Sequence, residues 1–191
     1  MKKLTMITLG LLAMACGRNA SDKVGEPAIA PDSGLEAQVQ KIVSGMSLDD
    51  KVGQMCEINI DVICADSLVD GQVVLDPAKV KTAFEQYRVG SVLNTPLGHA
   101  QTPETWHRII SGIQDASMEY IGVPDIFGVD QNHGTTYTQG GTLFPQEINM
   151  AASFNRDLVR EGARITAYES RACAIPWVYN PVMDLGRNPV W

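Results

Sequence analysis

Short apolar runs alternate with longer amphipathic stretches along residues 35–182, and this alternation limits the fold more than any other feature of the chain. A strand, a helix and the next strand form a crossover unit, and successive units of this kind build a parallel sheet covered by helices. The sequence therefore predicts an α/β fold with a parallel sheet. The expected strands are Ile58–Ile63, Gly90–Asn94, the run that ends at Asp130, and Pro176–Val182.

The expected helices are identified by residues that can cap a first turn and by apolar stripes at helical spacing. They cover Leu35–Ser44 and Arg156–Glu169, the latter capped by Asn155, and three more begin at Ser47, Asp76–Pro77 and Thr102–Pro103. We expect each stripe, and the strand residue Trp177, to lie in the core. In chain order the stripes are Leu35, Val39, Ile42 and Val43, then Leu48, Val52 and Met55, then Val80, Phe84 and Tyr87, then Trp106, Ile109, Ile110 and Ile113, and finally Leu158, Val159 and Ile165.

The composition is that of a folded protein, and the net charge argues against one class of partner. Of the 191 residues, 45% are hydrophobic and 19% are charged, which is typical of a globular domain. The formal net charge of -7, together with the lack of a basic stripe, argues against binding to nucleic acid. The sequence also lacks the glycine-rich loops of nucleotide-binding domains and the Gly-x-Ser-x-Gly motif of serine hydrolases.

Residues 1–20 have the pattern of an export signal, because two lysines precede an apolar run too short to span a bilayer. The small residues before Cys16 resemble a bacterial lipoprotein signal, so we expect lipid attachment at Cys16. The alternative is an ordinary secreted protein in which Cys16 is the first mature residue. The lipoprotein interpretation places the protein in the periplasm or at the outer membrane or cell surface of a Gram-negative bacterium, held to the membrane through the lipid anchor only. Residues 21–34 are interpreted as a flexible linker and residues 35–191 as a folded domain.

The remaining cysteines and the histidines carry little signal for a metal or a cofactor. Cys56, Cys64 and Cys173 form no Cys-x-x-Cys pair. One interpretation is a disulfide between Cys56 and Cys64, and the other is three unpaired, buried cysteines. The three histidines lack the close spacing of a helical metal site. We therefore expect no metal site and no cofactor.

The strongest candidate for a functional side chain is Asp130. An apolar strand pattern ends at this carboxylate, and a polar loop that contains glycine follows. Ligand sites on parallel sheets lie at the carboxyl ends of strands, so Asp130 is expected at the rim of such a site. The alternative is structural, with Asp130 capping the next turn or pairing with a Lys or Arg.

Structural roles are expected for three further residues near this stretch. His133 and Gly134 are interpreted as residues that shape the loop, since glycine permits backbone angles that other residues avoid. Arg187 is interpreted as an ion-pair partner of Asp184 or Asp130.

Four sequence blocks carry a resemblance to a known family. They are Met46–Met55, Gly128–Gly134, Gly141–Gln146 and the segment from Pro176 to Trp191. In this order they closely resemble the N-terminal (β/α)8 barrel of glycoside hydrolase family 3. The joint presence of Asp-x-x-His-Gly and Thr-Leu-Phe-Pro is similar to the β-glucosidase branch of that family.

The resemblance implies both a fold and an activity. The chain would form the N-terminal portion of a (β/α)8 barrel, incomplete in this chain. The protein would hydrolyse terminal, non-reducing β-D-glucosyl or related β-glycosyl residues by a retaining mechanism, in carbohydrate catabolism. Asp130 matches the family's substrate-binding aspartate, whose two oxygens accept hydrogen bonds from adjacent sugar hydroxyls. The implied partner is a β-linked oligosaccharide or glycoside.

The family's catalytic residues have no match in this chain. In the family, the nucleophile and the acid/base carboxylates belong to segments beyond the block that ends here at Trp191. No catalytic residue is therefore assigned, and we expect the 191-residue chain alone to be poorly folded and catalytically silent. The alternative function is a non-catalytic surface lipoprotein that binds carbohydrate through Asp130.

Overall fold

The computed structural model describes residues 30–183, 187–188 and 190, and the chain divides into two units between Gly45 and Met46. In the first unit the described residues form helix α2 (Ser33–Gly45), which begins two residues before the predicted start. No residue of α2 is buried, so the prediction that its apolar stripe lies in the core is wrong. The export signal over residues 1–20 and the expected lipid attachment site at Cys16 lie outside the described residues.

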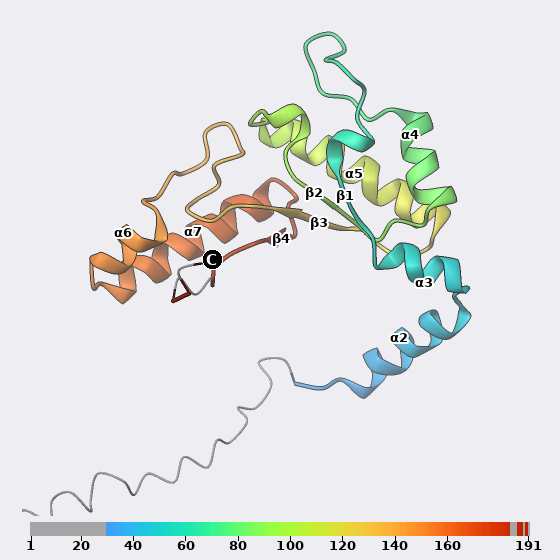
Figure 1. Cartoon of the computed structure of the whole chain (residues 1–191), viewed down its shortest axis with the longest axis horizontal. Coiled ribbons are helices and arrows are strands. Elements are labelled where there is room, and N and C mark those ends of the chain that lie inside the picture. The colour runs from blue at the N-terminus through green and yellow to red at the C-terminus, as the bar shows by residue number, and fades with distance from the viewer. Residues whose placement is uncertain (1–29, 184–186, 189, 191) are drawn as a thin grey trace, which may run out of the picture. The chain divides into compact units, whose positions relative to one another are not determined.

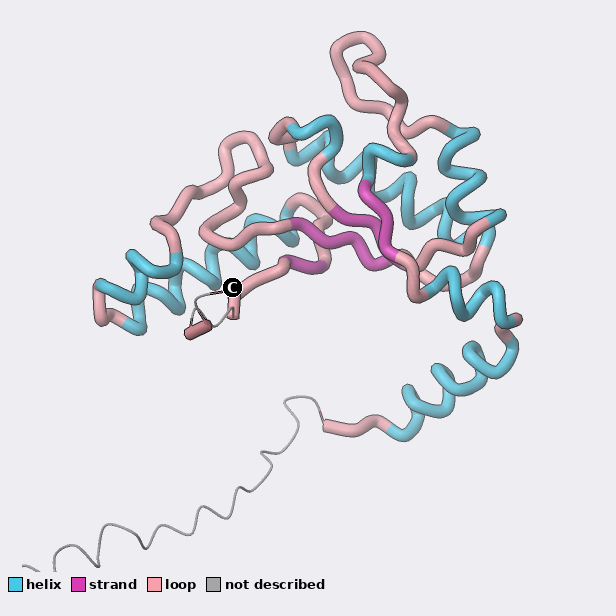
Figure 2. Tube along the Cα trace, in the orientation of Figure 1, coloured by secondary structure: helices cyan, strands magenta, loops and turns pink. Residues whose placement is uncertain are grey.

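Four parallel strands form the sheet of the second unit, in the order β1-β2-β3-β4 (Figure 1). Figure 2 shows the strands side by side, with helical segments and loops between consecutive strands. The predicted parallel α/β sheet is therefore confirmed. The strands are β1 (Glu57–Asn59), β2 (Ser91–Leu93), β3 (Ile126–Val129) and β4 (Trp177–Val178).

Strand β2 is one residue shorter at each end than predicted, and β1 and β4 are much shorter. The run expected over Ile58–Ile63 leaves the sheet after Asn59, whose side chain accepts a hydrogen bond from the amide of Asp61 (2.9 Å). A side chain that bonds a nearby amide competes with the strand ladder, and a 3-10 helix, η1 (Ile60–Val62), follows. At the other edge, β4 ends at Val178, well before Val182.

The predicted helix starts are confirmed at Ser47, Asp76, Thr102 and Asn155. At each of them a side-chain oxygen accepts a hydrogen bond from a backbone amide of the first turn, which has no partner within the helix. A short helix, α6, was not predicted. Besides η1, the described helices of this unit are α3 (Leu48–Gln54), α4 (Pro77–Lys81), the π-helix η2 (Thr82–Gln86), the 3-10 helix η3 (Pro96–Gly98), α5 (Pro103–Tyr120), α6 (Glu147–Ala152) and α7 (Arg156–Ala172).

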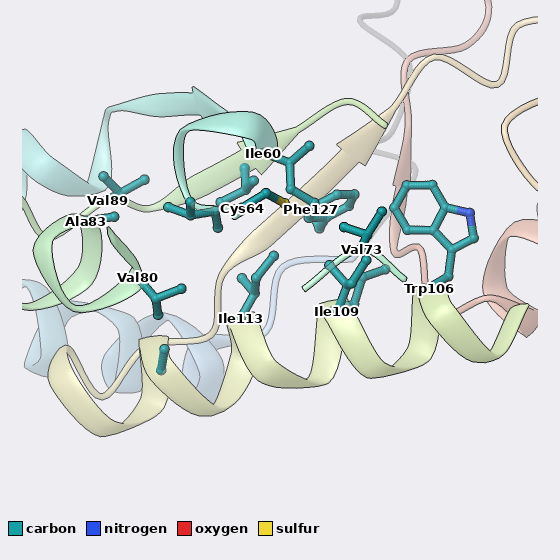
Figure 3. Close-up of a cluster of buried hydrophobic side chains, with 14 of the residues drawn as sticks. Ile60, Cys64, Val73, Val80, Ala83, Val89, Trp106, Ile109, Ile113 and Phe127 are labelled. Atoms are coloured by element: carbon teal, nitrogen blue, oxygen red, sulfur yellow. The ribbon is translucent and has the colours of Figure 1, made fainter. Parts of the chain in front are cut away.

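The core lies between α5 and the sheet (Figure 3). Trp106 of α5 meets Phe127 of β3 edge to face, with ring centroids 5.7 Å apart, and both side chains are fully buried. Ile109, Ile110 and Ile113 of α5 are also buried, as predicted. Each large apolar side chain buried here stabilises the fold by about 2 kcal/mol. This packing fixes β3, and with it the loop at its carboxyl end.

The apolar stripe predicted for α3 is not buried. Leu48, Val52 and Met55 are all exposed, because α3 packs through Gly53 instead. A Cβ atom at Gly53 would lie 2.2 Å from the carbonyl oxygen of Tyr87, a distance that only glycine permits. The close backbone contact therefore decides which face of α3 turns inward.

A change of helix type displaces Tyr87 from the core. Val80 and Phe84 are buried as predicted, but Tyr87 is 61% exposed. After Lys81 the α-helix widens into η2, whose hydrogen bonds run over five residues rather than four. The wider turn rotates Tyr87 off the buried face.

Helix α7 buries small residues rather than the large apolar residues of its predicted stripe. Gly162, Thr166 and Ser170 are buried, whereas Leu158 is exposed. The hydroxyls of Thr166 and Ser170 donate to carbonyl oxygens one turn earlier, at 3.0 and 2.7 Å, so they need no partner outside the helix. The other two residues of the predicted stripe, Val159 and Ile165, are half-buried.

Two further expectations are corrected. Trp177 is 45% exposed, because alternation along β4 places it in register with Gly128, on the sheet face opposite the core. Cys56, Cys64 and Cys173 are all free, so the structure contains no disulfide between Cys56 and Cys64. Cys56 is exposed, which also differs from the expectation of three buried cysteines.

Candidate active site

The carboxyl ends of parallel strands meet at one edge of a sheet, and Asp130 lies at this edge directly after β3, as predicted. The residue is half-buried, and no hydrogen bond between described residues involves its carboxylate. A carboxylate in this state retains its capacity to accept hydrogen bonds from a ligand. Among the described residues, the carboxylate of Asp130 therefore neither caps the next turn nor pairs with a Lys or Arg.

The expected ion pair of Arg187 does not involve Asp130. Among the ion pairs that join described residues, none includes either side chain, and Arg187 is exposed. The other expected partner, Asp184, lies outside the described residues.

The turn after Asp130 contains buried polar atoms without protein partners. Gln131 is fully buried, and neither its Oε1 nor its Nε2 atom has a hydrogen-bond partner among the described residues. The same holds for Oδ1 of Asn132. Most buried polar atoms in proteins are paired, so the side-chain atoms of this turn are an exception among the described residues.

Asn180 connects this turn to the end of β4. Its Nδ2 atom donates to the carbonyl oxygens of both Gln131 and Asn132, each at 3.0 Å. The backbone amide of Tyr179 donates to the carbonyl oxygen of Val129 (3.2 Å), which continues the contact between the two strands. The loops that follow β3 and β4 are thus held together by both backbone and side chain.

The loop beyond the turn is shaped by His133 and Gly134, in agreement with the prediction. Gly134 has a φ of 112°, and a Cβ atom there would lie 2.0 Å from the carbonyl oxygen of Thr142. Nδ1 of His133 donates to the carbonyl oxygen of Phe144 (3.0 Å), while Nε2 accepts from the side-chain amide of Gln146 (3.1 Å). Because a carbonyl oxygen only accepts, the contact with Phe144 requires a proton on Nδ1 of His133.

Helix α7 holds the same loop through Glu169. Its carboxylate accepts hydrogen bonds from the amide (2.8 Å) and the hydroxyl (2.6 Å) of Thr142. Burial raises the pKa of Glu169, but the hydrogen bonds from Thr142, together with the nearby hydroxyl of Thr135, outweigh burial and hold the pKa below its ordinary value. The ionised form of Glu169 is therefore the one that ties the loop to the helix.

A second polar group crosses the sheet on the face opposite the core. The hydroxyl of Tyr179 donates to Oε1 of Glu57, at the start of β1, and its ring passes over Gly128. Burial raises the pKa of Tyr179, and the nearby carboxylates of Glu57, Asp130 and Asp125 raise it further. Tyr179 therefore stays protonated and donates its hydrogen bond over the whole physiological pH range.

Asp125 lies at the other end of β3, before the strand begins. Its side chain is only 4% exposed, and among the described residues neither carboxylate oxygen has a hydrogen-bond partner with good geometry. Burial raises its pKa to about 7, and the charge of Glu57 adds to this effect, while the backbone of Val92 opposes it. Asp125 belongs to the amino end of the strand and does not join Asp130 at the carboxyl edge.

A cavity of about 440 Å³ lies beside the Asp130 turn, lined by residues of the loops after β3 and β4 and of helices α6 and α7. Its lining includes Asn132, His133 and Asn180 but not Asp130.

The described residues contain no group of three or more His, Cys, Asp or Glu side chains that could hold a metal ion. None of the helices in the described ranges is long and apolar enough to cross a membrane.

The position of Asp130 was predicted from the sequence, whereas Tyr179, Asn180 and Glu57 were not predicted to lie near it. Tyr179 and Asn180 were assigned to a longer strand, although the rule that selected Asp130 also applies to the residues after β4. Glu57 is separated from Tyr179 by 122 positions, and no local pattern links them.

Comparisons with known proteins agree with this geometry. Residues 47–191 match the family model described as the glycosyl hydrolase family 3 N terminal domain. The chain is 30% identical over 168 residues to the lysosomal beta glucosidase of Dictyostelium discoideum. The aligned region covers 83% of this chain and 20% of that protein. It is 26% identical over 178 residues to the periplasmic beta-glucosidase of Salmonella typhimurium, covering 90% of this chain and 19% of that protein.

The structural comparison supports the same assignment. The crystal structure of exo-1,3/1,4-beta-glucanase from a Pseudoalteromonas species superposes with a TM-score of 0.67 and 28% identity, covering 85% of this chain and 19% of that chain. The predicted fold, a part of a (β/α)8-type barrel, is therefore confirmed, while the chain spans about a fifth of the length of the curated relatives it matches. Since the family model covers most of the sequence, the chain belongs to glycosyl hydrolase family 3 through the N terminal domain of that family.

Proposed function

We propose that the protein is a glycosidase that removes terminal β-D-glucosyl or related β-glycosyl residues from the non-reducing end of its substrate. Membership of glycosyl hydrolase family 3 supports this proposal, as do relatives described as beta-glucosidases and as an exo-1,3/1,4-beta-glucanase. Because the chain spans about a fifth of those beta-glucosidases, the activity is proposed for the protein expressed from its complete reading frame.

The observation that carries the proposal is the state of Asp130. A half-buried carboxylate at the carboxyl end of β3, free of hydrogen bonds to the described residues, can accept two hydrogen bonds from neighbouring sugar hydroxyls. Such bonds hold the sugar ring and can strengthen as the ring distorts towards an oxocarbenium-like transition state. We therefore assign Asp130 a substrate-binding role.

The proposed mechanism is retaining, with two carboxyl groups about 5 Å apart acting as nucleophile and as acid/base. No residue of this chain is proposed for either role. Asp125 is buried at the amino end of β3, and Glu57 is occupied by the hydroxyl of Tyr179. Neither carboxylate is therefore available at the edge where the substrate would bind.

The test is hydrolysis of an aryl β-glucoside by the protein expressed from its complete reading frame. Asp130→Asn should lower kcat/KM at least about 100-fold, because hydrogen bonds to a charged group are worth roughly 1.5–3 kcal/mol each. Asp115→Asn, which changes an exposed carboxylate on α5, should leave kcat/KM unchanged. NMR of the first anomer released should show retention of configuration.

Two outcomes would contradict this proposal. If Asp130→Asn hydrolyses the glucoside as well as the unsubstituted protein, Asp130 does not hold the sugar. If the unsubstituted protein binds glucose or cello-oligosaccharide saturably without turnover, the protein is a carbohydrate-binding lipoprotein rather than an enzyme.

We further propose that the protein is exported and carries a lipid at Cys16. The support is the signal-like pattern of residues 1–20 and the periplasmic or lysosomal placement of the relatives. Metabolic labelling with a radioactive fatty acid should mark the protein, and Cys16→Ser should remove the label. Cys56→Ser, which changes an exposed cysteine in the folded part, should retain it. Label that persists in Cys16→Ser would refute lipid attachment at this residue.

A further inference from the structure

Asn180 is the side chain through which the loop after β4 holds the turn after Asp130. Only the amide nitrogen of Asn180 can donate to carbonyl oxygens, so the orientation of its side chain follows from its two partners. Nδ2 has two hydrogens and two acceptors, the carbonyl oxygens of Gln131 and Asn132, both at 3.0 Å. The donor capacity of this amide is thus fully used on the two residues that follow Asp130.

The side chains of the turn do not hold it in place themselves. Among the described residues, the buried side-chain amide of Gln131 and Oδ1 of Asn132 have no hydrogen-bond partner. The turn closes on itself through one short bond, from the amide of Gln131 to the carbonyl oxygen of Val129 (2.9 Å). Asn180 is therefore the side chain that fixes this turn relative to the neighbouring strand.

The other contacts of the loop lie further along the chain. His133 bonds to Phe144, and the amide of Thr135 donates to the carbonyl oxygen of Thr142 (3.0 Å). These bonds join parts of the loop to one another, and Glu169 joins the loop to α7. None of them joins the first two residues of the turn to β4.

We propose that Asn180 is a positioning residue for substrate binding, which sets the direction of the Asp130 carboxylate by holding the two carbonyl groups that follow it. This inference rests on the proposed function of Asp130. Asn180 itself is not proposed to contact the sugar. A shift of about 1 Å in a binding group can cost on the order of 100-fold in rate, so a small change in this turn is measurable in catalysis.

The test is a double-mutant cycle in the protein expressed from its complete reading frame, with an aryl β-glucoside as substrate. Asn180→Ala should lower kcat/KM about 10-fold or more. In a protein that already carries Asp130→Asn, adding Asn180→Ala should lower kcat/KM less than about threefold. The reason is that the side chain which Asn180 positions is already impaired. Asn180→Ser, which retains one donor, should give an intermediate loss, and Asn180→Asp, which retains the shape without the donors, should resemble Asn180→Ala.

Asn155→Ala is the matched control. Asn155 also bonds two backbone groups, the amides of Asp157 and Leu158 at 3.2 and 3.1 Å, but it caps α7 and does not contact the Asp130 turn. The Asn155→Ala substitution should lower the melting temperature about as much as Asn180→Ala does. It should leave kcat/KM near that of the unsubstituted protein. A merely structural role for Asn180 would make the two variants alike.

The outcomes separate this inference from the proposed function. If the unsubstituted protein hydrolyses the glucoside and Asp130→Asn impairs it, the proposed function stands. The positioning role is then overturned if Asn180→Ala lowers kcat/KM by the same factor with and without Asp130→Asn. It is also overturned if Asn155→Ala lowers kcat/KM as much as Asn180→Ala does. Should Asn180→Ala not fold, Asn180→Ser in the same two backgrounds decides the question. If the unsubstituted protein has no activity, the proposed function fails first.

Discussion

The hydroxyl of Tyr179 donates a hydrogen bond to the carboxylate of Glu57, from one edge of the four-stranded sheet to the other. The ring reaches across because Gly128 of β3, which lies beneath it, has no side chain. A Cβ atom at Gly128 would come within 2.3 Å of the Tyr179 oxygen and 2.5 Å of its ring. Three residues far apart in the sequence thus depend on one another for their conformations.

We expect Gly128→Ala to lower the free energy of unfolding by about 1–3 kcal/mol, because the new methyl group displaces the ring of Tyr179. Urea denaturation of the protein expressed from its complete reading frame measures this change. Gly162→Ala, in contrast, should stabilise the protein by up to about 1 kcal/mol, since its Cβ would lie at ordinary contact distance from Phe144 (3.6 Å) within a helix. Adding Tyr179→Ala to Gly128→Ala should remove the clash, so the double variant should lose less free energy of unfolding than the sum of the two single losses. If the double loss equals that sum, the new methyl group does not act through the ring of Tyr179.

The raised pKa of Asp125 makes stability depend on pH in a defined direction. Its pKa is about 7 in the folded protein against an ordinary value of 3.8, so the folded state binds a proton more tightly than the unfolded chain. The contribution to stability is present below pH 3.8 and is lost as the pH rises through 7. Asp125→Asn should therefore raise the free energy of unfolding at pH 8, by on the order of 2–4 kcal/mol, and change it little at pH 4.

Asp115→Asn is the control for that experiment, because Asp115 is an exposed carboxylate on α5. It should leave the shape of the stability profile between pH 4 and pH 8 unchanged. An Asp125→Asn profile parallel to that of the unsubstituted protein would mean that Asp125 is ionised in the folded state throughout this range.

Glu169 should have the opposite pH dependence. The hydrogen bonds from Thr142 hold its pKa below the ordinary value of 4.5, so its contribution to stability is present above pH 4.5 and is lost as the pH falls through the folded-state pKa. Glu169→Gln should lower the free energy of unfolding by about 1–2 kcal/mol at pH 7. The difference in free energy of unfolding between Glu169→Gln and the unsubstituted protein should become smaller as the pH falls through the folded-state pKa of Glu169. A difference that is constant from pH 7 to pH 3 would show that the charge of Glu169 is not involved.

Gly134 and Gly71 form a matched pair for testing the loop after Asp130. Both have positive φ angles, 112° and 74°, but only Gly134 is crowded, by the carbonyl oxygen of Thr142. Gly71→Ala should cost about 1–2 kcal/mol of stability, from backbone strain alone. Gly134→Ala should cost more and should also lower kcat/KM for the aryl β-glucoside. Equal losses of stability in the two variants would show that the contact with Thr142 is not close.

Much of the fold follows from short-range patterns. The caps at Ser47, Asp76, Thr102 and Asn155 depend on side chains and amides two or three residues apart, so they were predicted correctly. The long stripe of α5 was also predicted, because large apolar residues at helical spacing have few alternatives to burial. The failures occurred where packing rather than periodicity selects the buried face. In α3 and α7 the inward residues include Gly53 and Gly162, which no measure of hydrophobicity would select.

The sequence by itself determined the alternation of strands and helices, the parallel sheet, and the position of Asp130 at the carboxyl end of a strand. Each of these depends on residue type and local spacing. Only the tertiary structure decided what surrounds Asp130. The contact of Tyr179 with Glu57 and the hydrogen bonds of Asn180 to the Asp130 turn span 122 and about 50 positions of the chain. Such contacts exist because the strands of a parallel sheet, whether neighbours like β3 and β4 or opposite edges like β1 and β4, come from distant parts of the chain. Only folding brings these residues together.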